Sequence, residues 1–214
     1  MEAMATLAGL RVLIVGVGGV GSWCAEALLR TGVGRLVLVD DDTVQPSNLN
    51  RQCPALAATM GRPKVEAMKE RLLAIDPAAE VEAHAVRFRP DDAESLALLD
   101  GVTVVVDAID SVEAKAALIL AATERKIPLV SSMGAARRLD PTAVKVVRFD
   151  KVTGDGLARA LGHRFRTLGR FPARFDCVVS TEPPLAAEKG SIMPVTAAFG
   201  MTLAAWVIRR RFEV

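Results

Sequence analysis

A glycine-rich segment, Gly16 to Gly21, constrains the fold of this chain more than any other feature. It follows the apolar run Leu10 to Val15, which is typical of a buried strand, and it precedes apolar positions at helical spacing from Trp23 to Leu28. A G-x-G-x-x-G pattern between a strand and a helix is typical of a nucleotide-binding turn. Glycine lets the backbone approach phosphates, and the helix N-terminus presents free N–H groups to them.

The rest of the first half alternates between strand-like and helix-like segments. We expect further strands at 36–39, 81–87, 102–106 and 128–131, and helices at 64–73 and 113–125. This order is typical of βαβ units on a parallel sheet. The predicted fold class is therefore α/β, a Rossmann-like doubly wound and mostly parallel sheet flanked by helices.

Beyond Met133 the pattern changes. We expect a strand at 144–149, a long irregular basic stretch at 151–176 and a closing apolar helix at 192–208. The apolar helix is slightly short for a membrane span, which needs about 20 residues, so burial against the sheet is favoured over membrane insertion. No linker separates two cores. We predict one domain over 1–214, with a nucleotide-binding core at 1–133 and substrate-side elements at 134–214.

Cysteine content and the start of the chain indicate the compartment. Three cysteines with no C-x-x-C pair fit neither a disulfide framework nor a paired-cysteine zinc site. The start, Met1 to Gly9, has no basic region before its apolar stretch, so no signal peptide is predicted. We therefore expect the reducing cytoplasm. The net charge of +2 does not by itself indicate a polyanionic partner.

The loop after the second predicted strand decides between nucleotides. Asp40 can accept a hydrogen bond from a ribose hydroxyl, which with the glycine turn suits NAD, FAD or ATP alike. A triphosphate needs cations as well; Arg51 can bind two phosphate oxygens, and Lys64 can act as a point charge. An ordinary polar surface loop is the alternative. The predicted ATP-binding residues are Gly16, Gly18, Gly19, Gly21, Asp40, Asp42, Asn48, Arg51, Gln52 and Lys64.

Two carboxylates, Asp107 and Asp110, follow the predicted central strand, where open α/β sheets bind ligands. A carboxylate there can hold Mg²⁺ against phosphates. A structural role explains Asp107 equally well. His84 and His163 have no nearby Cys or His in the sequence, so we expect no histidine chemistry.

Four segments resemble the motifs of one superfamily. They are GVGGVGS at 16–22, LVDDDTVQPSNLNRQ at 38–52, GRPKVEAM at 61–68 and DAIDS at 107–111. The chain resembles the ThiF/HesA/MoeB superfamily of ubiquitin-activating-like adenylating enzymes. Within it, the resemblance is closest to the tRNA threonylcarbamoyladenosine dehydratases, through DAIDSVEAKAALI, KIPLVSSMGA, DCVVSTE and VTAAFGM.

The resemblance implies a reaction in which ATP is consumed. The threonyl carboxylate of the modified adenosine attacks the α-phosphate, pyrophosphate leaves, and the acyl-adenylate closes a ring with net loss of water. The partners implied are tRNA carrying threonylcarbamoyladenosine and a second copy in a homodimer. A sulfur-mobilising protein is a further candidate partner. The catalytic residues implied are Arg51, Lys64 and Asp110, with Asp110 binding Mg²⁺.

The start of the chain departs from the superfamily. Its members usually carry an N-terminal helical segment with an arginine that reaches the partner subunit's nucleotide, and this sequence begins almost at its first strand. Either the start is truncated, or Arg11 substitutes, or nucleotide binds without turnover. Besides the dehydratase, two functions stay open: activation of the C-terminal glycine of a ubiquitin-like sulfur carrier, and an inactive nucleotide-binding scaffold. Absence of C-x-x-C weighs against the carrier.

Two features of the C-terminal third have competing explanations. Cys177 could act as a nucleophile, but intramolecular ring closure needs no thioester, so we expect a buried small hydrophobe. The basic stretch suits contact with tRNA phosphates, and a solvated surface explains it nearly as well. Its aromatic side chains could stack on bases or belong to the core. The residues concerned are Arg159, Arg164, Arg166, Arg170, Arg174, Phe165, Phe171 and Phe175.

Overall fold

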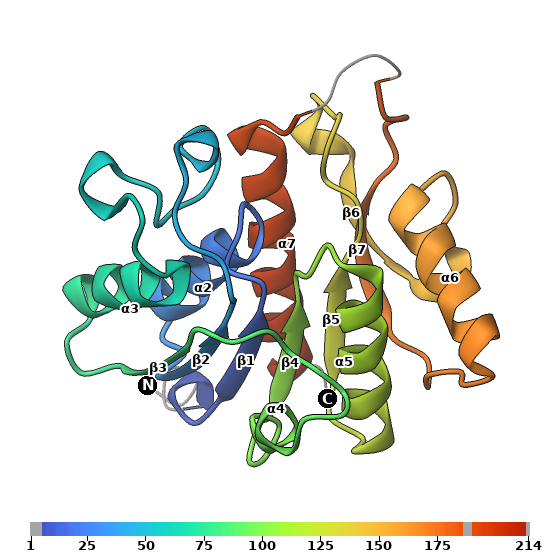
Figure 1. Ribbon diagram of the computed structural model, residues 1–214, viewed down its shortest axis with the longest axis horizontal. Coiled ribbons are helices and arrows are strands. Elements are labelled where there is room, and N and C mark those ends of the chain that lie inside the picture. The colour runs from blue at the N-terminus through green and yellow to red at the C-terminus, as the bar shows by residue number, and fades with distance from the viewer. Residues whose placement is uncertain (1–5, 186–189, 213–214) are drawn as a thin grey trace.

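The computed structural model describes residues 6–185 and 190–212. Its centre is a seven-stranded sheet in the order β3-β2-β1-β4-β5-β7-β6 (Figure 1). All neighbouring strands are parallel except β6 and β7. The strands are β1 (Arg11–Val15), β2 (Arg35–Val39), β3 (Glu80–His84), β4 (Val104–Asp107), β5 (Leu129–Ser132), β6 (Val144–Arg148) and β7 (Asp176–Ser180). The predicted α/β fold class is confirmed.

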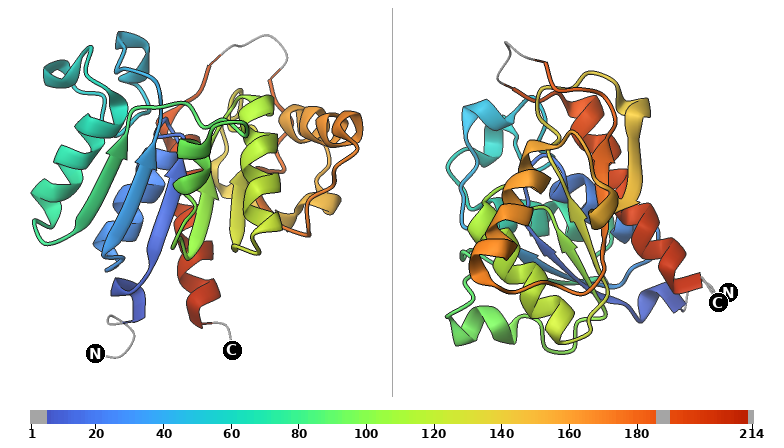
Figure 2. Two further views of the ribbon diagram at one scale, coloured as in Figure 1. Left: turned by 60° about the horizontal axis from the view of Figure 1, so that its bottom comes forward. Right: turned by 90° about the vertical axis from the view of Figure 1, so that its right-hand side faces the viewer.

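Helices cover both faces of the sheet (Figure 2). One face carries α2 (Gly21–Arg30), α3 (Lys64–Ile75) and α7 (Met193–Phe212). The opposite face carries α4 (Ala93–Ala97), α5 (Val112–Glu124) and α6 (Gly156–Leu168). The sheet is therefore buried on both sides, which explains why its central strands are continuous apolar runs.

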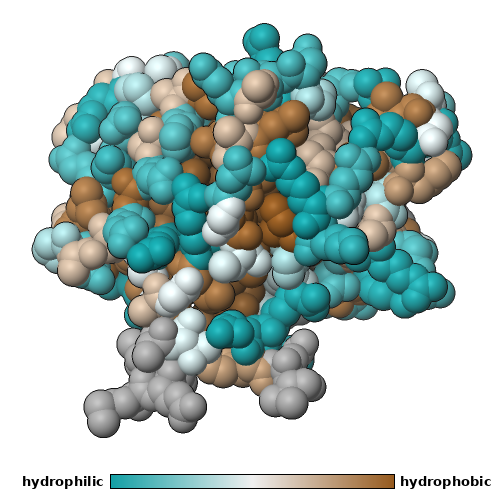
Figure 3. All heavy atoms as spheres, turned by 90° about the horizontal axis from the view of Figure 1, so that it is seen from below, coloured by the Kyte–Doolittle hydropathy of each residue, from teal (hydrophilic) through white to brown (hydrophobic). Residues whose placement is uncertain are grey.

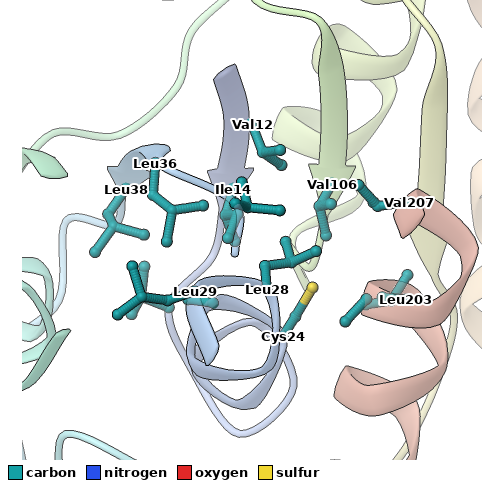
Figure 4. Packing of buried hydrophobic residues seen from close by; sticks show 14 of the residues in the cluster. Val12, Ile14, Cys24, Leu28, Leu29, Leu36, Leu38, Val106, Leu203 and Val207 are labelled. Carbon is teal, nitrogen blue, oxygen red and sulfur yellow. The ribbon is translucent and has the colours of Figure 1, made fainter. Parts of the chain in front are cut away.

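Side-chain alternation along β1 divides the core into two clusters. Val12 and Ile14 pack with α2 and α7, as Figure 4 shows, whereas Leu13 and Val15 pack with α5 on the other face. This follows from the period of two in a strand, where successive side chains point to opposite faces. The run at 10–15 therefore contributes to both cores, with Leu10, Val12 and Ile14 in one and Leu13 and Val15 in the other.

The closing helix α7 packs tightly against α2. At Gly200 a Cβ would lie 2.5 Å from the carbonyl oxygen of Val20 and 2.9 Å from the amide nitrogen of Cys24, so only glycine allows this approach. Phe199 and Leu203 are fully buried on either side of it. The predicted buried helix is confirmed, and no helix among the described residues has the length and apolarity to cross a membrane.

The prediction of an irregular stretch at 151–176 is wrong in its centre, where α6 forms. Ala158, Leu161 and Phe165 are buried at helical spacing, the Asp155 side chain caps the N-terminus, and Gly169 ends the helix at φ +61°. The many arginines occupy the remaining positions. The apolar spacing was visible in the sequence and is the signal that could have identified this helix.

Two of the three phenylalanines in this region belong to the core. Phe165 and Phe175 are buried and pack against Phe149, with ring centroids 5.9 Å and 4.9 Å away from it. Phe171, in contrast, is 71% exposed. Base stacking is therefore excluded for Phe165 and Phe175 and remains open for Phe171.

The third strand is shorter than predicted. We expected it to reach Arg87, and β3 ends at His84. Within residues 6–185 and 190–212 its only partner strand is β2, which ends at Val39 opposite His84, so Ala85 and the following residues have no strand there to pair with.

Candidate nucleotide-binding site

A cavity lies where the carboxyl ends of β1 and β4 meet, at the point where the strand order reverses direction. Open α/β sheets bind ligands at this position. A cavity of about 410 Å³ opens here, which is a typical size for a small-molecule site. Its walls come from the segments that follow β1, β2, β3, β4 and β5.

The glycine turn forms one wall. Gly16, Gly18 and Gly19 line the cavity. Gly16 has φ +93°, and a Cβ there would lie 2.6 Å from the Ala108 carbonyl oxygen. A Cβ on Gly19 would lie 3.2 Å from Cγ of Arg51, so this glycine leaves room for the Arg51 side chain.

Gly21 does not line the cavity among the described residues, although we predicted it at the phosphates. It begins α2 directly against the turn, where a Cβ would lie 1.9 Å from the carbonyl oxygen of Gly16. Glycine at this position therefore lets the helix start close beneath the turn, so that its N-terminus faces the cavity.

Gly21→Ala is expected to lower the free energy of unfolding by about 1 to 3 kcal/mol, the usual range for an overpacked site. The added methyl group has nowhere to go except into the Gly16 carbonyl. Urea unfolding measures the change. Gly156→Ala is the matched control, since a Cβ there meets no atom within 4 Å; equal stability of the two variants would contradict the prediction.

Asp40 joins the glycine turn to the next loop. Its Oδ2 accepts a hydrogen bond from the Val17 amide at 2.6 Å, and its Oδ1 accepts one from the Asp42 amide at 2.9 Å. Burial raises the pKa of this carboxyl, while these two amides and the nearby Lys64 oppose the rise. Each oxygen still has capacity to accept from a ligand hydroxyl.

Lys64 is held at the start of α3 by an ion pair. Its Nζ lies 2.6 Å from Oδ2 of Asp42, and its side chain is 7% exposed compared with 67% for Asp42. Both residues line the cavity. The Lys64 ammonium group can leave the exposed Asp42 carboxylate and bind a phosphate group when a more highly charged anion enters the cavity.

The loop at 46–52 is fixed by its own backbone and by α2. Trp23 Nε1 donates to the Arg51 carbonyl oxygen at 2.9 Å, and Asn48 Oδ1 accepts from the Gln45 amide at 3.0 Å. Among the described residues, the Arg51 guanidinium donates only to neighbours within the loop, the Ser47 carbonyl and the Asn50 side chain. The loop therefore keeps its shape while the end of the Arg51 side chain can turn to a ligand.

Gln52 is a buried residue in the wall of the cavity. Its Oε1 is itself buried and has no hydrogen-bond partner among the described residues. Its amide nitrogen lies beside the glycine turn, where a Cβ on Gly18 would be 3.8 Å from it. Gln52 can therefore offer an N–H donor to a ligand at the turn.

Asp107 has a structural role, the alternative left open by the sequence. It is fully buried, and its Oδ2 lies 2.7 Å from Lys115 Nζ and accepts from Ser131 Oγ at 2.6 Å. Lys115 Nζ donates further to Ser131 Oγ and to the Ser132 carbonyl. Asp107 Oδ1 accepts from the Ile109 amide at 3.1 Å. This network ties β4, α5 and β5 together under the floor of the cavity.

Asp110, three residues later, reaches the cavity. It is exposed, and among the described residues its carboxylate makes no hydrogen bond or ion pair. By contrast, the acidic cluster formed by Asp40, Asp41 and Asp42 is partly engaged internally, through the amides and Lys64. A free carboxylate with hard oxygen donors fits Mg²⁺, which keeps most of its waters.

A second wall comes from residues that the sequence did not identify. Val86, Arg87 and Phe88 follow β3, and the segment 132–136 follows β5. The rule that ligands bind at carboxyl ends of parallel strands could have pointed to both segments. Exposed Arg87 adds a cation at the rim.

A buried ion pair supports that second wall. Asp155 accepts from the Gly134 amide at 3.1 Å and caps α6 at the Ala158 amide at 2.9 Å. Arg138 is buried, donates to the Gly134 carbonyl and pairs with Asp155 at 3.3 Å. The pocket segment after β5 is thereby fixed to the N-terminus of α6.

Other residues considered from the sequence lie away from the cavity. Arg11 is at the amino end of β1, at the opposite end of the strand from the glycine turn, and pairs with Glu82 at 2.8 Å. His84 and His163 do not line the cavity among the described residues. Cys177 is fully buried in β7, and burial raises the pKa of its thiol.

Cys177→Ala is expected to leave the rate at saturating substrate within about three-fold of wild type, because a buried thiol with a raised pKa is a poor nucleophile. The companion measurement is thiol titration. All three cysteines are buried, so the native chain should react only after denaturation. A complete loss of turnover in a folded Cys177→Ala variant would contradict this prediction and support Cys177 as a catalytic nucleophile.

A comparison with protein families matches residues 1–212 to the ThiF family. The chain belongs to the ThiF family. Relatives of this ThiF-family chain include the tRNA threonylcarbamoyladenosine dehydratase of Bacillus subtilis, 42% identical over 185 residues, which span 86% of this chain and 72% of the relative. The molybdopterin-synthase adenylyltransferase of Escherichia coli is 39% identical over 155 residues, 72% of this chain and 59% of that protein.

A solved structure covers nearly the whole ThiF-family chain. It is the Escherichia coli tRNA N6-threonylcarbamoyladenosine dehydratase, TcdA, in complex with ATP. The TM-score is 0.91 at 37% identity, with 99% of this chain and 89% of that chain covered. The similarity therefore includes the C-terminal elements β6, α6 and β7, and it covers a larger share of the chain than the match to the adenylyltransferase does.

Proposed function

We propose that this chain catalyses the ATP-dependent dehydration of threonylcarbamoyladenosine in tRNA. The observation that carries the proposal is the cavity at the β1–β4 junction, which combines a glycine turn, the cations Arg51 and Lys64 with Arg87 at the rim, and the carboxylate of Asp110. The likeness to a dehydratase crystallised with ATP supports it over the full length.

The site residues suit each part of ATP. We place Asp40 at the ribose, Gly18, Gly19 and the start of α2 at the phosphates, and Arg51 and Lys64 at the triphosphate. Asn48, Asp42 and Gln52 complete the binding set, with Gln52 donating from its amide nitrogen, which lies beside Gly18.

Adenylation needs mainly positioning and charge neutralisation. The threonyl carboxylate attacks the α-phosphorus, and the bond to the bridging oxygen of pyrophosphate breaks. Arg51 and Lys64 stabilise the charge that moves onto the leaving pyrophosphate. A nucleophile within the same threonylcarbamoyl group then attacks the acyl carbon, and AMP leaves with one carboxylate oxygen, so that one water is lost in total.

Asp110 would hold Mg²⁺ in this site. Its carboxylate is exposed to the cavity and unpaired among the described residues, which suits a metal that binds through one or two carboxylates and substrate phosphates. Bound Mg²⁺ supplies charge neutralisation at the phosphates. The Asp107 network fixes the backbone that presents Asp110, through the Ile109 amide.

Activation of a ubiquitin-like sulfur carrier is the second candidate. Its support is the likeness to molybdopterin-synthase adenylyltransferase, which reaches 72% of this chain. The sequence holds no C-x-x-C pair for the zinc site of many activating enzymes. The dehydratase likeness covers more of the chain, and we therefore favour the tRNA substrate.

The partners and the cellular compartment of the protein are proposals that rest on its family. We infer that the protein works as a homodimer in the cytoplasm, and that a sulfur-mobilising protein can act beside it. Sedimentation at micromolar concentration tests the dimer. A monomer with full activity would contradict it.

The deciding experiment is mass spectrometry of tRNA nucleosides after incubation with ATP and Mg²⁺. The threonylcarbamoyl nucleoside should lose the mass of one water, and pyrophosphate exchange should depend on tRNA that carries this modification. Exchange only with a carrier protein would select the second candidate. ATP binding without exchange in either case would leave a nucleotide-binding scaffold.

A further inference from the structure

The outer side of α6 and the loop that follows it form a basic surface with one exposed aromatic ring. Between Gly156 and Phe175 the sequence contains five arginines and no acidic residue. The view onto this side of the molecule shows α6 at the front (Figure 2, right). Seen from below, hydrophilic residues predominate at the right-hand edge, where α6 lies, with a few hydrophobic ones among them (Figure 3).

The arginines of this region fall into two groups. Arg164 and Arg170 pair with Glu113 and Glu124 of α5, so their charges are balanced. Arg159, Arg166 and Arg174 are exposed and make no ion pair among the described residues.

We define the α6 surface as Arg159, Arg166, Phe171 and Arg174. Arg159 and Arg166 are seven residues apart and therefore lie on the same side of the helix. Ala158, Leu161 and Phe165 are the buried residues of the helix and face the core. Phe171 follows the helix and is 71% exposed, with Arg174 three residues beyond it.

Helix α6 begins at the candidate site. Leu157, in the first turn of α6, lines the cavity, and the capping Asp155 is bonded to the cavity segment at Gly134. From there the thirteen residues of the helix extend for about 20 Å at 1.5 Å per residue. A chain of anions that enters the cavity at one end can therefore contact the arginines in sequence.

We propose that the α6 surface binds the phosphate backbone of the tRNA outside the modified nucleotide, and that Phe171 stacks on an unpaired base. This rests on the proposed function and extends it to a docking face. Exposed arginines without an ion-pair partner suit contact with phosphates, and phosphate contacts supply much of the affinity for nucleic acids. An exposed aromatic ring beside them suits base stacking, which tolerates any sequence.

The test compares tRNA binding by wild type with a triple variant, Arg159→Ala, Arg166→Ala and Arg174→Ala. The dissociation constant should rise at least about ten-fold at 0.15 M salt, and the slope of log K against log salt should fall by about 2 to 3. ATP affinity should not change, because none of the three residues lines the cavity. The matched control removes three cations at the β2–β3 end of the sheet, Arg35→Ala, Arg62→Ala and Lys69→Ala, and should bind tRNA like wild type.

Phe171→Ala separates stacking from charge. It should weaken tRNA binding about five-fold or more and leave the salt slope unchanged. Replacement of the three arginines by lysine should keep the salt slope, and this variant covers the case in which the alanine variant fails to fold.

Two outcomes would overturn the docking face while leaving the proposed function intact. In one, wild type dehydrates the tRNA and the triple variant has an unchanged KM for it. In the other, the triple variant loses self-association but binds tRNA normally, which would make the surface an interface between copies. If wild type itself fails to remove water from modified tRNA, the proposed function fails, and tRNA binding then tests the surface independently.

Discussion

Lys115→Met is expected to lower the free energy of unfolding by about 3 to 5 kcal/mol. The substitution keeps much of the side-chain volume and removes only the ammonium group. Asp107 would then be a fully buried carboxylate without a counter-charge, with only Ser131 and the Ile109 amide as donors. Urea unfolding monitored by circular dichroism measures the loss.

Two further variants separate the charge from the lysine itself. Lys145→Met, on the exposed face of β6, removes a cation without a buried partner and should change stability by at most about 0.5 kcal/mol. Asp107→Asn combined with Lys115→Met should recover part of the loss, because no unpaired charge remains buried. A loss below about 1 kcal/mol for Lys115→Met alone would contradict the structural role of the pair.

Arg51→Ala is expected to reduce ATP–pyrophosphate exchange by roughly 10²- to 10³-fold, the effect of removing one preorganised donor from a developing charge. The fold should survive, because Trp23 holds the loop through the Arg51 backbone carbonyl, which alanine retains. The side chain itself bonds only to Ser47 and Asn50 within the loop. Exchange is measured with labelled pyrophosphate and tRNA that carries the modification.

Arg62→Ala is the control for charge. It also lies in the region between β2 and α3, but its guanidinium pairs with Glu70 and it does not line the cavity. Its exchange rate should equal that of wild type. Arg51→Lys should recover only part of the rate, since an ammonium group cannot bind two phosphate oxygens as a planar fork does. An unchanged rate in Arg51→Ala would refute the triphosphate assignment.

The sequence predicted those parts of the fold that depend on neighbouring residues. The apolar run at 10–15, the glycine turn after it and the closing helix that contains Gly200 were all identified, because strand and helix periodicity and the need for glycine are local properties. Helix α6 was missed although its signal was equally local. Its arginines suggested an irregular solvated stretch, and the buried spacing of Ala158, Leu161 and Phe165 was overlooked.

The sequence predicted many of the residues that line the candidate site, but it did not predict which segments face one another across the cavity. Gly16, Asp40, Arg51, Lys64 and Asp110 lie around one cavity, as the order of strands in an open α/β sheet leads one to expect. That the wall at 132–136 faces them could not be read from spacing, because it depends on β5 lying next to β4.

What the sequence by itself determined is the glycine turn, the strand and helix periods and the identity of the cations, since backbone geometry and side-chain chemistry fix these locally. Only the tertiary structure decided which charges pair. Lys115 meets Asp107 and Ser131 because β4, α5 and β5 pack side by side, and Lys64 meets Asp42 across a loop of more than twenty residues. Burial makes these pairs important for stability, because a charge removed from water needs a partner. The position of that partner depends on how the whole sheet is assembled.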